Sequence, residues 1–331
     1  MGNFDGLPEE MRLKILTRLP TQSILKCKSV SKSWRQIVHH PSFPQVHLTH
    51  LHDSDSGKLG FILFHKSGLV EYTEYDDESY SHDIPPFSKA RRFNLISPFT
   101  DYEILDSCNG LICFNAVRSD YCGPSFICNP VTRECVTLPK LEGKELLTGF
   151  GYSSSTNEYK VVGISQRDPQ FGIVQVYTLG SGTGWRNDGK MDYNAIFVGR
   201  RGVIANGALH WLCIRGIIVA FDLASEKFRK IPSPACIPES GQFYSLVVLG
   251  DCLCAISYNE NGTWFMTWKK EYRLSNQIPF ASTKNGGLLC CFLGGTRGNI
   301  YHTNPKDSST KLLERFGMSV CLVIPHKNTL I

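Results

Sequence analysis

The stretch Phe126–Pro139 reads FICNPVTRECVTLP, and its pattern returns as VAFDLASEKFRKIP over Val219–Pro232. Each copy has an apolar run, a short segment that contains Thr or Ser, a second run with β-forming residues, and a closing proline. Polar turn residues hydrogen-bond locally and join two antiparallel strands, while a proline prevents the second strand from continuing. The pattern therefore predicts two similar β-hairpins.

These hairpins belong to a longer repeat. Comparable runs begin at residues 57, 109, 157, 206, 250 and 298, so successive starts are about 44 to 52 residues apart. That spacing is typical of one four-stranded propeller blade with its loops. We therefore predict an all-β domain over residues 57–331, with a six-bladed β-propeller as the favoured count. A five-bladed ring or a β-sandwich would also accommodate these runs.

The first 40 residues have a helical period instead. Leu7-Pro8-Glu9-Glu10 is typical of a helix start, because Pro suits the first turn and carboxylates suit the positive end of the helix dipole. Met11, Ile15, Leu16 and Leu19 then recur at spacings of three and four. Pro20 ends that helix, Thr21 is placed to cap a second one, and Ser31 is placed to cap a third that ends before Pro41. The sequence predicts a small module of three helices.

Three short helices cannot bury all of their apolar surface among themselves. A partner protein, or the chain's own β domain, should cover the remainder. Residues 1–50 contain seven Lys/Arg against three Asp/Glu, a net charge of +4, whereas the rest of the chain is close to neutral. A basic surface of this kind suits an acidic partner.

Composition narrows the class of protein. Of the 331 residues, 42% are hydrophobic and 20% charged, which is typical of a globular chain. Neither a membrane-spanning stretch nor the basic and apolar start of a signal peptide is evident, so we expect a cytoplasmic or nuclear protein with no membrane partner. The 13 cysteines include no CxxC pair. In a reducing compartment we expect them, Cys252, Cys254, Cys290 and Cys291 among them, to be small buried hydrophobes.

Residues 7–40, LPEEMRLKILTRLPTQSILKCKSVSKSWRQIVHH, resemble an F-box. The agreement includes the Leu19-Pro20 break, the stretch from Cys27 to Lys32, and Trp34. The remainder resembles the plant F-box-associated (kelch-like) domain through four motifs, which are Asn109-Gly110-Leu111-Ile112-Cys113, Asn129-Pro130-Val131-Thr132, Gly149-Phe150-Gly151-Tyr152 and Tyr159-Lys160-Val161-Val162.

The resemblance implies the substrate-recognition subunit of an SCF-type cullin–RING ubiquitin ligase. It divides the chain into an F-box module (residues 1–45), a linker (46–56) and a domain that binds an unidentified protein target (57–331). It also implies that a Skp-type linker subunit, and through it the cullin–RING scaffold, binds the module. By position the contacts would come from Leu7, Pro8, Ile15, Leu16, Leu19, Pro20, Leu25, Val30 and Trp34.

Other chemistry is weakly represented. His47, His50, His52 and Asp53 have a spacing that could bind a metal, but we interpret them as part of a solvated linker. The basic pairs Arg200-Arg201 and Lys269-Lys270 are too sparse for nucleic acid, although either pair could meet an acidic ligand. We expect no catalytic residues, metal or cofactor. A propeller enzyme, such as a glycosidase or lactonase, would need carboxylates converging at the central channel. A scaffold that binds the linker subunit without delivering a target for degradation is the other alternative.

Overall fold

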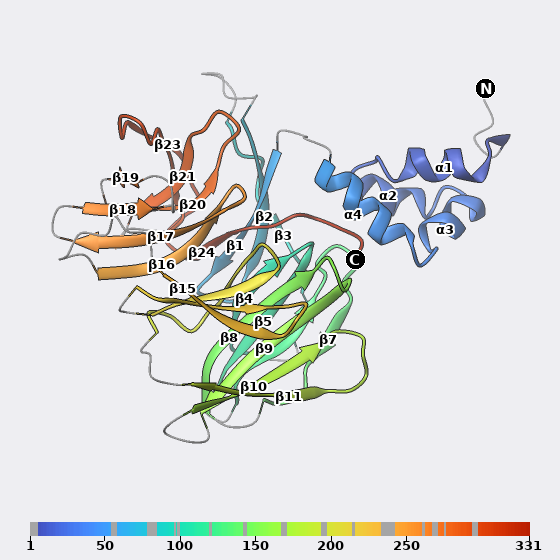
Figure 1. Cartoon of the computed structure of the whole chain (residues 1–331). Helices are drawn as coiled ribbons and strands as arrows, with labels where there is room; N and C mark the ends of the chain where they lie inside the picture. Colours follow the sequence, from blue (N-terminus) through green and yellow to red (C-terminus); the bar gives the residue numbers. More distant parts are fainter. Residues whose placement is uncertain are drawn as a thin grey trace.

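The computed structural model describes residues 6–53, 58–77, 85–95, 97, 100–118, 121–141, 144–166, 171–192, 197–213, 216–232, 242–259, 262–266, 271–274, 276–292 and 297–331. Lys269-Lys270 lies outside these residues. A helical module comes first and lies beside a much larger β domain (Figure 1). No helix among the described residues is long and apolar enough to cross a membrane.

The helical module contains four helices, so the predicted count of three is wrong. They are α1 (Glu9–Leu16), α2 (Thr21–Cys27), α3 (Lys32–Val38) and α4 (Phe43–Asp53). The additional helix occupies most of the segment that we had interpreted as a linker. Phe43, His47 and Leu48 lie on one face of α4 and are almost fully buried. Their spacing of four and five residues is helical, but proline and histidine at neighbouring positions obscured it in the sequence.

The described residues of the β domain form 24 strands. In chain order they are β1 (Lys58–His65), β2 (Val70–Asp76), β3 (Arg91–Arg92), β4 (Tyr102–Cys108), β5 (Leu111–Arg118), β6 (Tyr121–Cys128), β7 (Cys135–Thr137), β8 (Lys144–Ser153), β9 (Glu158–Gln166), β10 (Phe171–Thr178), β11 (Trp185–Asp192), β12 (Val203–Ala205), β13 (Ala208–Leu212), β14 (Ile218–Asp222), β15 (Lys227–Ile231), β16 (Gln242–Leu249), β17 (Cys252–Asn259), β18 (Gly262–Met266), β19 (Glu271–Leu274), β20 (Gln277–Ser282), β21 (Leu288–Phe292), β22 (Asn299–Thr303), β23 (Thr310–Arg315) and β24 (Val320–Pro325).

The strands form six four-stranded antiparallel sheets. Five are sequential meanders: β4–β7, β8–β11, β12–β15, β16–β19 and β20–β23. The sixth combines both ends of the domain in the order β24–β1–β2–β3, with Ile62 paired to Ile324. Since β24 closes a sheet that β1 begins, the first and last parts of the domain are joined by backbone hydrogen bonds.

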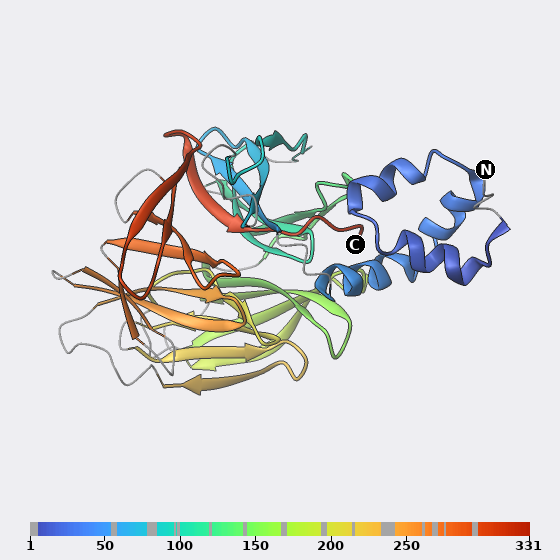
Figure 2. The same ribbon diagram turned by 90° about the horizontal axis from the view of Figure 1, so that it is seen from above.

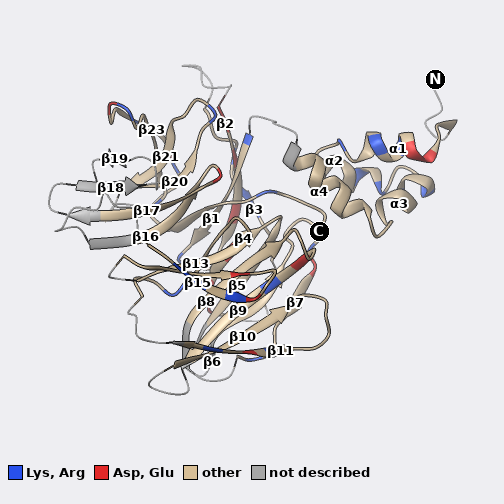
Figure 3. Cartoon of the chain, in the orientation of Figure 1, with Lys and Arg blue, Asp and Glu red and all other residues tan. Residues whose placement is uncertain are grey.

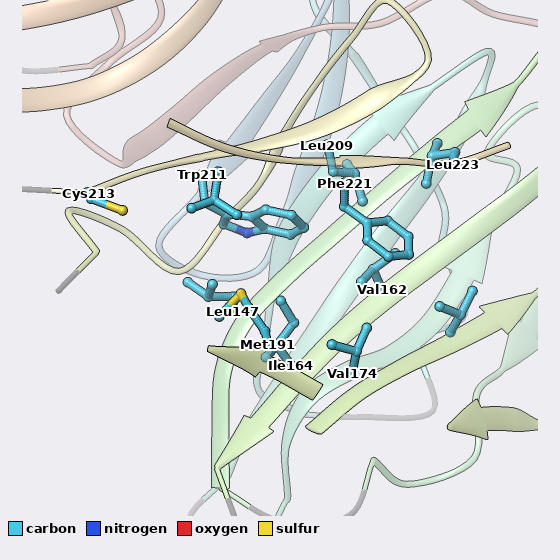
Figure 4. Close-up of a cluster of buried hydrophobic side chains, with 12 residues drawn as sticks. Leu147, Val162, Ile164, Val174, Met191, Leu209, Trp211, Cys213, Phe221 and Leu223 are labelled. Carbon is cyan, nitrogen blue, oxygen red and sulfur yellow. The ribbon is translucent and has the colours of Figure 1, made fainter. Parts of the chain in front are cut away.

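Each sheet packs against the next one along the chain. One shared core joins the sheets β8–β11 and β12–β15 through Val162, Ile164, Trp211 and Phe221 (Figure 4). Similar clusters join the other neighbours, and β12 and β13 contact β16. Phe61 of the first sheet meets Phe280 of the last with their ring centroids 5.5 Å apart. The sheets therefore pack in chain order, and the last sheet packs against the first. Figure 2 shows the same arrangement from above.

The two predicted hairpins are confirmed and share one turn geometry. They pair β6 with β7 and β14 with β15. Asn129 Oδ1 accepts hydrogen bonds from two following backbone N–H groups, and Asp222 Oδ1 does the same in the second hairpin. Arg133 and Glu226, four residues later, adopt positive φ angles of 66° and 56°. A third copy turns at Asn304 between β22 and β23, with Ser308 at φ 59°.

In most sheets, the predicted start of the repeat falls at the turn before the second strand of the sheet. Asn109-Gly110 and Asn206-Gly207 form two-residue turns between the first and second strands, with positive φ at both positions. Such turns match the twist of the hairpin they connect. The start assigned at residue 298 is out of step, because it precedes the third strand of its sheet; Gly286 is the equivalent turn.

The expectation that all cysteines are free is wrong. Cys128 and Cys135 form a disulfide across the β6–β7 hairpin. They are paired residues in the two-stranded register, so the turn at Asn129 brings them together. Cys254, Cys290 and Cys291 are buried as predicted, whereas Cys252 is exposed.

Candidate functional site

An exposed apolar strip follows one side of α1. Met11 is 51% exposed and Ile15 is 41% exposed, and they lie one helical turn apart. Pro8, directly before α1, is also exposed. Val30, in the turn between α2 and α3, is 64% exposed. Large apolar side chains in solvent are typical of a surface that another protein covers.

The residues predicted to bind a linker subunit fall into separate structural groups. Leu16 is fully buried, and Leu19, Leu25 and Trp34 pack partly buried against the same core. Leu7 is half-buried. The exposed group is Pro8, Ile15, Pro20 and Val30. Met11 is also exposed, although it was not among the predicted contact residues. Its position one helical turn before Ile15 is the sequence signal that could have identified it.

The core of the helical module explains this division. Leu16, Ile24, Ile37 and Phe43, one from each helix, are at most 6% exposed and form one cluster. The fourth helix supplies side chains that three helices lack, so the core is closed without Met11, Ile15 or Val30. These three are therefore left available for a partner.

Local capping only partly follows the prediction. Ser31 caps α3 as expected, because its Oγ accepts a hydrogen bond from Trp34 N at 3.2 Å. Thr21 does not cap α2. It is the first residue of that helix, and its hydroxyl donates instead to the carbonyl of Asn328 at 2.8 Å.

Exposed basic residues lie on the same helical module as the apolar strip. Lys and Arg are distributed over α1, α2 and α3, and Glu9 and Glu10 lie at the start of α1 (Figure 3). Lys14, Arg18, Lys26, Lys32 and Arg35 are all exposed. The first three helices therefore present both apolar and positively charged side chains to solvent.

The segment after β24 connects the helical module to the β domain. Leu330 is 8% exposed and lies in the core of the module, together with Val131 from the β6–β7 turn. The side-chain amide of Asn129 donates to the carbonyls of Thr329 and Ile331. Gln45 Nε2 of α4 also donates to the Tyr152 hydroxyl at 3.2 Å. Both views place the end of the described chain beside the helices (Figures 1 and 2).

Gly110 is required at this junction for two reasons. Its φ of 87° is unfavourable for other residues, and a Cβ there would collide with the Thr329 side chain. Thr329 Oγ1 in turn donates to the Asn109 carbonyl at 2.7 Å. The Asn109-Gly110 turn therefore also contacts the C-terminal segment through Thr329.

The β domain encloses a central cavity of about 1070 Å³. Its lining comes from β4, β16, β20 and β24 and from the segment 197–204. Most of the wall is apolar, including Leu105, Val247 and Phe280. A cavity with apolar walls and a few polar groups is the usual form of a ligand site.

The acidic residues that line the cavity come from one strand. Among the described lining residues, Glu103 and Asp106 are acidic, and both come from β4. Glu103 is engaged by Arg201 at 2.8 Å. Burial raises the pKa of Asp106 to about 7, while its Oδ1 accepts from Ser107 N. Three other acids of the β domain, Glu158, Asp222 and Asp251, do not line the cavity.

A serine–histidine pair also borders the cavity. Ser107 Oγ lies 2.7 Å from His326 Nδ1. Burial lowers the pKa of His326 to about 3, and its ring lies against Tyr72 and Phe93. A histidine this weakly basic is a poor general base at neutral pH. The pair instead connects β4 to the end of β24.

The histidines that we interpreted as part of a solvated linker lie on α4. His47 is fully buried and its Nε2 lies 2.9 Å from the Leu19 carbonyl, so it is a core residue and not part of a solvated linker. The side chains of His52 and Asp53 lie outside the described residues. No group of three or more metal-binding side chains occurs within the described part of the chain.

Comparison with known proteins agrees with both regions. The F-box domain model matches residues 4–45, and the model of the F-box associated beta propeller domain matches residues 63–249. F-box protein At3g07870 of Arabidopsis thaliana is 30% identical, over 86% of this chain and 76% of its own length. F-box/kelch-repeat protein At3g23880 of the same plant is 25% identical, over 76% and 72%. Among solved structures, Kluyveromyces lactis Hsv2 overlaps 76% of each chain with a TM-score of 0.40 and 13% identity. The chain therefore belongs to the family of F-box proteins that carry an F-box-associated β-propeller domain.

Proposed function

We propose that this protein is a target-recognition subunit of an SCF-type cullin–RING ubiquitin ligase in the cytoplasm, the nucleus or both. In this role it catalyses nothing itself. It raises the local concentration of a bound target near the conjugating enzyme. The F-box match and the F-box relatives support an adaptor role in general.

The observation that carries the proposal is the exposed strip of Pro8, Met11 and Ile15, together with the exposed Val30, on a module whose core is already closed. Contact with a Skp-type subunit would bury this strip. The exposed basic residues of the module suit an acidic partner, and charges at the rim of an interface chiefly speed association. Leu16, by contrast, would contribute by holding the module together.

We further propose that the six sheets are the blades of a closed six-bladed propeller over residues 57–331. The shared sheet of β1 and β24 and the packing of the last sheet on the first support this. Closure leaves no long exposed sheet edge and gathers loops on two faces, where side chains can hold a target.

Capture by a purified Skp-type subunit tests the docking step. Ile15→Glu should reduce capture by at least tenfold, because a charge would have to be buried in an apolar contact. Val136→Glu is a matched control, because Val136 is 43% exposed against 41% for Ile15 but lies on β7. Undiminished capture by folded Ile15→Glu protein would contradict the proposal.

Turnover distinguishes a degradative receptor from a scaffold. Proteins that associate with the full chain should accumulate when the proteasome is inhibited, and the Ile15→Glu variant should bind them without promoting their loss. Associated proteins whose abundance is unaffected in either case would favour the non-degradative scaffold. Carboxylates that act on a substrate bound in the cavity would favour the enzyme alternative instead.

A further inference from the structure

The segment 197–202 forms part of the wall of the central cavity and is held firmly. Thr148 N of β8 donates to the Arg200 carbonyl at 2.8 Å, and Gly202 N donates to the Thr148 carbonyl at 2.7 Å. Val198 N donates to the Leu212 carbonyl on the other side. The segment is therefore fixed between β8 and β13, and Arg200 and Arg201 are held at the cavity on a braced backbone.

The two arginines differ in their partners. Arg201 is ion-paired with Glu103 across the cavity at 2.8 Å. Arg200 lines the cavity, is exposed, and forms no ion pair with any carboxylate among the described residues. A third lining arginine, Arg297, lies against the sulfur of Cys291 at 3.3 Å. Among the described residues, no carboxylate therefore neutralises the charge of Arg200 at the cavity.

The charge inside the cavity favours an anion. Glu103 is neutralised by Arg201, and Asp106 is about half protonated near neutral pH because burial raises its pKa to about 7. Burial also lowers the pKa of His210, so that this lining histidine is neutral there. Near pH 7 the arginines therefore outweigh the carboxylates that remain ionised.

The rest of the wall favours an apolar body. Leu212 on β13, Val247 on β16, Ile256 on β17 and Ile278 on β20 face the same space as Arg200. The volume of about 1070 Å³ is at the upper end of what small-molecule sites usually have. An inorganic anion would use the arginine and leave this apolar wall in contact with water.

We propose that the central cavity is a binding site for a small amphipathic organic acid, with its carboxylate at Arg200 and its apolar body along the walls formed by β13, β16 and β20. The site is separate from the docking strip on α1. It does not depend on the proposed ligase role, because neither Met11 nor Ile15 borders the cavity.

Calorimetry with the full chain and a series of straight-chain acids tests the proposal. Decanoate should bind with a stoichiometry of one, acetate should not bind measurably, and affinity should rise about fourfold for each added methylene. Decylamine, which has the same apolar body and the opposite charge, should bind at least tenfold more weakly. Equal binding of decanoate and decylamine would contradict the assignment.

Variants locate the site. Arg200→Ala should weaken decanoate binding at least tenfold, and Arg200→Lys should restore part of the loss because it keeps the charge. Arg315→Ala, at an exposed arginine on β23 away from the cavity, should change nothing. Decanoate binding that is unaffected by Arg200→Ala, or equally weakened by Arg315→Ala, would overturn the proposal. Capture of a Skp-type subunit by Arg200→Ala should be normal, so the docking function is tested separately.

Discussion

Thr21, the first residue of α2, donates a hydrogen bond of 2.8 Å from its hydroxyl to the carbonyl of Asn328, 307 residues later in the chain. Around this bond, Leu330 enters the core of the helical module and Asn129 holds the carbonyls of Thr329 and Ile331. The C-terminal segment is thus sandwiched between the two parts of the protein. In the proposed receptor role, such a junction would hold a bound target at a set distance from the ligase.

Removing the Thr21 hydroxyl should loosen the junction. We expect Thr21→Val, which keeps the shape of the side chain, to lower the free energy of unfolding by about 1 kcal/mol, because a partly buried hydrogen bond is lost. Hydrogen exchange should increase in residues 326–331 and at the start of α2. Thr49→Val is the control, because that hydroxyl bonds only within α4. Equal exchange in the two variants would show that the Thr21 bond does not restrain the segment.

Substitutions at the adjacent residues Leu16 and Ile15 should have different effects, the first on stability and the second on binding. Leu16→Ala removes a fully buried side chain and should lower the free energy of unfolding of the helical module by about 2–5 kcal/mol. Ile15→Ala should change it by less than about 1 kcal/mol while weakening capture of a Skp-type subunit. Thermal unfolding and capture measured on the same samples separate the two effects. Similar destabilisation by both variants would mean that Ile15 is also part of the core.

The Cys128–Cys135 disulfide should be detectable by alkylation. In native protein without reductant, iodoacetamide should modify the exposed Cys252 but not Cys135. After reduction, Cys135 should also react, since it lies in an exposed part of the hairpin. Cys135→Ser should lower the free energy of unfolding by about 2.5 kcal/mol through the lost constraint on the unfolded chain. Labelling of Cys135 before reduction would contradict the bond.

Glu226 should make stability depend on acidity. Although burial alone would raise it, hydrogen bonds from Arg186 and the buried Lys160 hold the pKa of Glu226 below its ordinary value of 4.5. The folded protein thus binds this proton less readily than the unfolded chain. Its stabilising contribution is present above about pH 4.5 and is lost as the pH falls through the lower folded pKa.

Comparison of variants over pH tests this contribution. We expect Glu226→Gln to be less stable than the parent by about 2 kcal/mol at pH 7, with the difference shrinking below pH 4. Glu134→Gln, at an exposed carboxylate in the β6–β7 turn, should behave like the parent. Urea unfolding at several pH values provides the measurement. A difference that persists unchanged at pH 3 would assign the effect to packing rather than charge.

Asp106 should set the pH dependence of acid binding in the cavity. Its pKa of about 7 means that its negative charge develops between pH 6 and pH 8, while decanoate is ionised throughout. Decanoate should therefore bind several-fold more tightly at pH 6 than at pH 8, and Asp106→Asn should remove the difference. The other titratable or charged groups nearby are Glu103 and Cys108 on β4, Cys113 on β5, Arg200 and Arg201 on the wall segment, His210 on β13, and Arg297. An unchanged pH profile in Asp106→Asn would assign the dependence to one of these.

Short-range patterns in the sequence were read correctly where one local rule decides the structure. The hairpin at Asn129 and the cap at Ser31 each depend on a side chain that bonds within a few residues of itself. The fourth helix was missed because burial of Phe43 and His47 against other helices, and not local propensity, stabilises it. The predicted cap at Thr21 is wrong because the hydrogen-bond partner of its hydroxyl, Asn328, is remote in sequence.

By itself, the sequence determined the elements and their repetition: helices up to residue 40, then β units whose turns recur about every 48 residues, because helix and hairpin formation depend on neighbours along the chain. Only the tertiary structure decided which apolar residues of the helical module face solvent, that the C-terminal segment enters its core, and that Arg200 lines a cavity in which no described carboxylate pairs with it. Burial and charge pairing depend on residues brought together across the whole chain, such as Thr21 with Asn328 and Arg201 with Glu103. No local sequence pattern predicts these contacts.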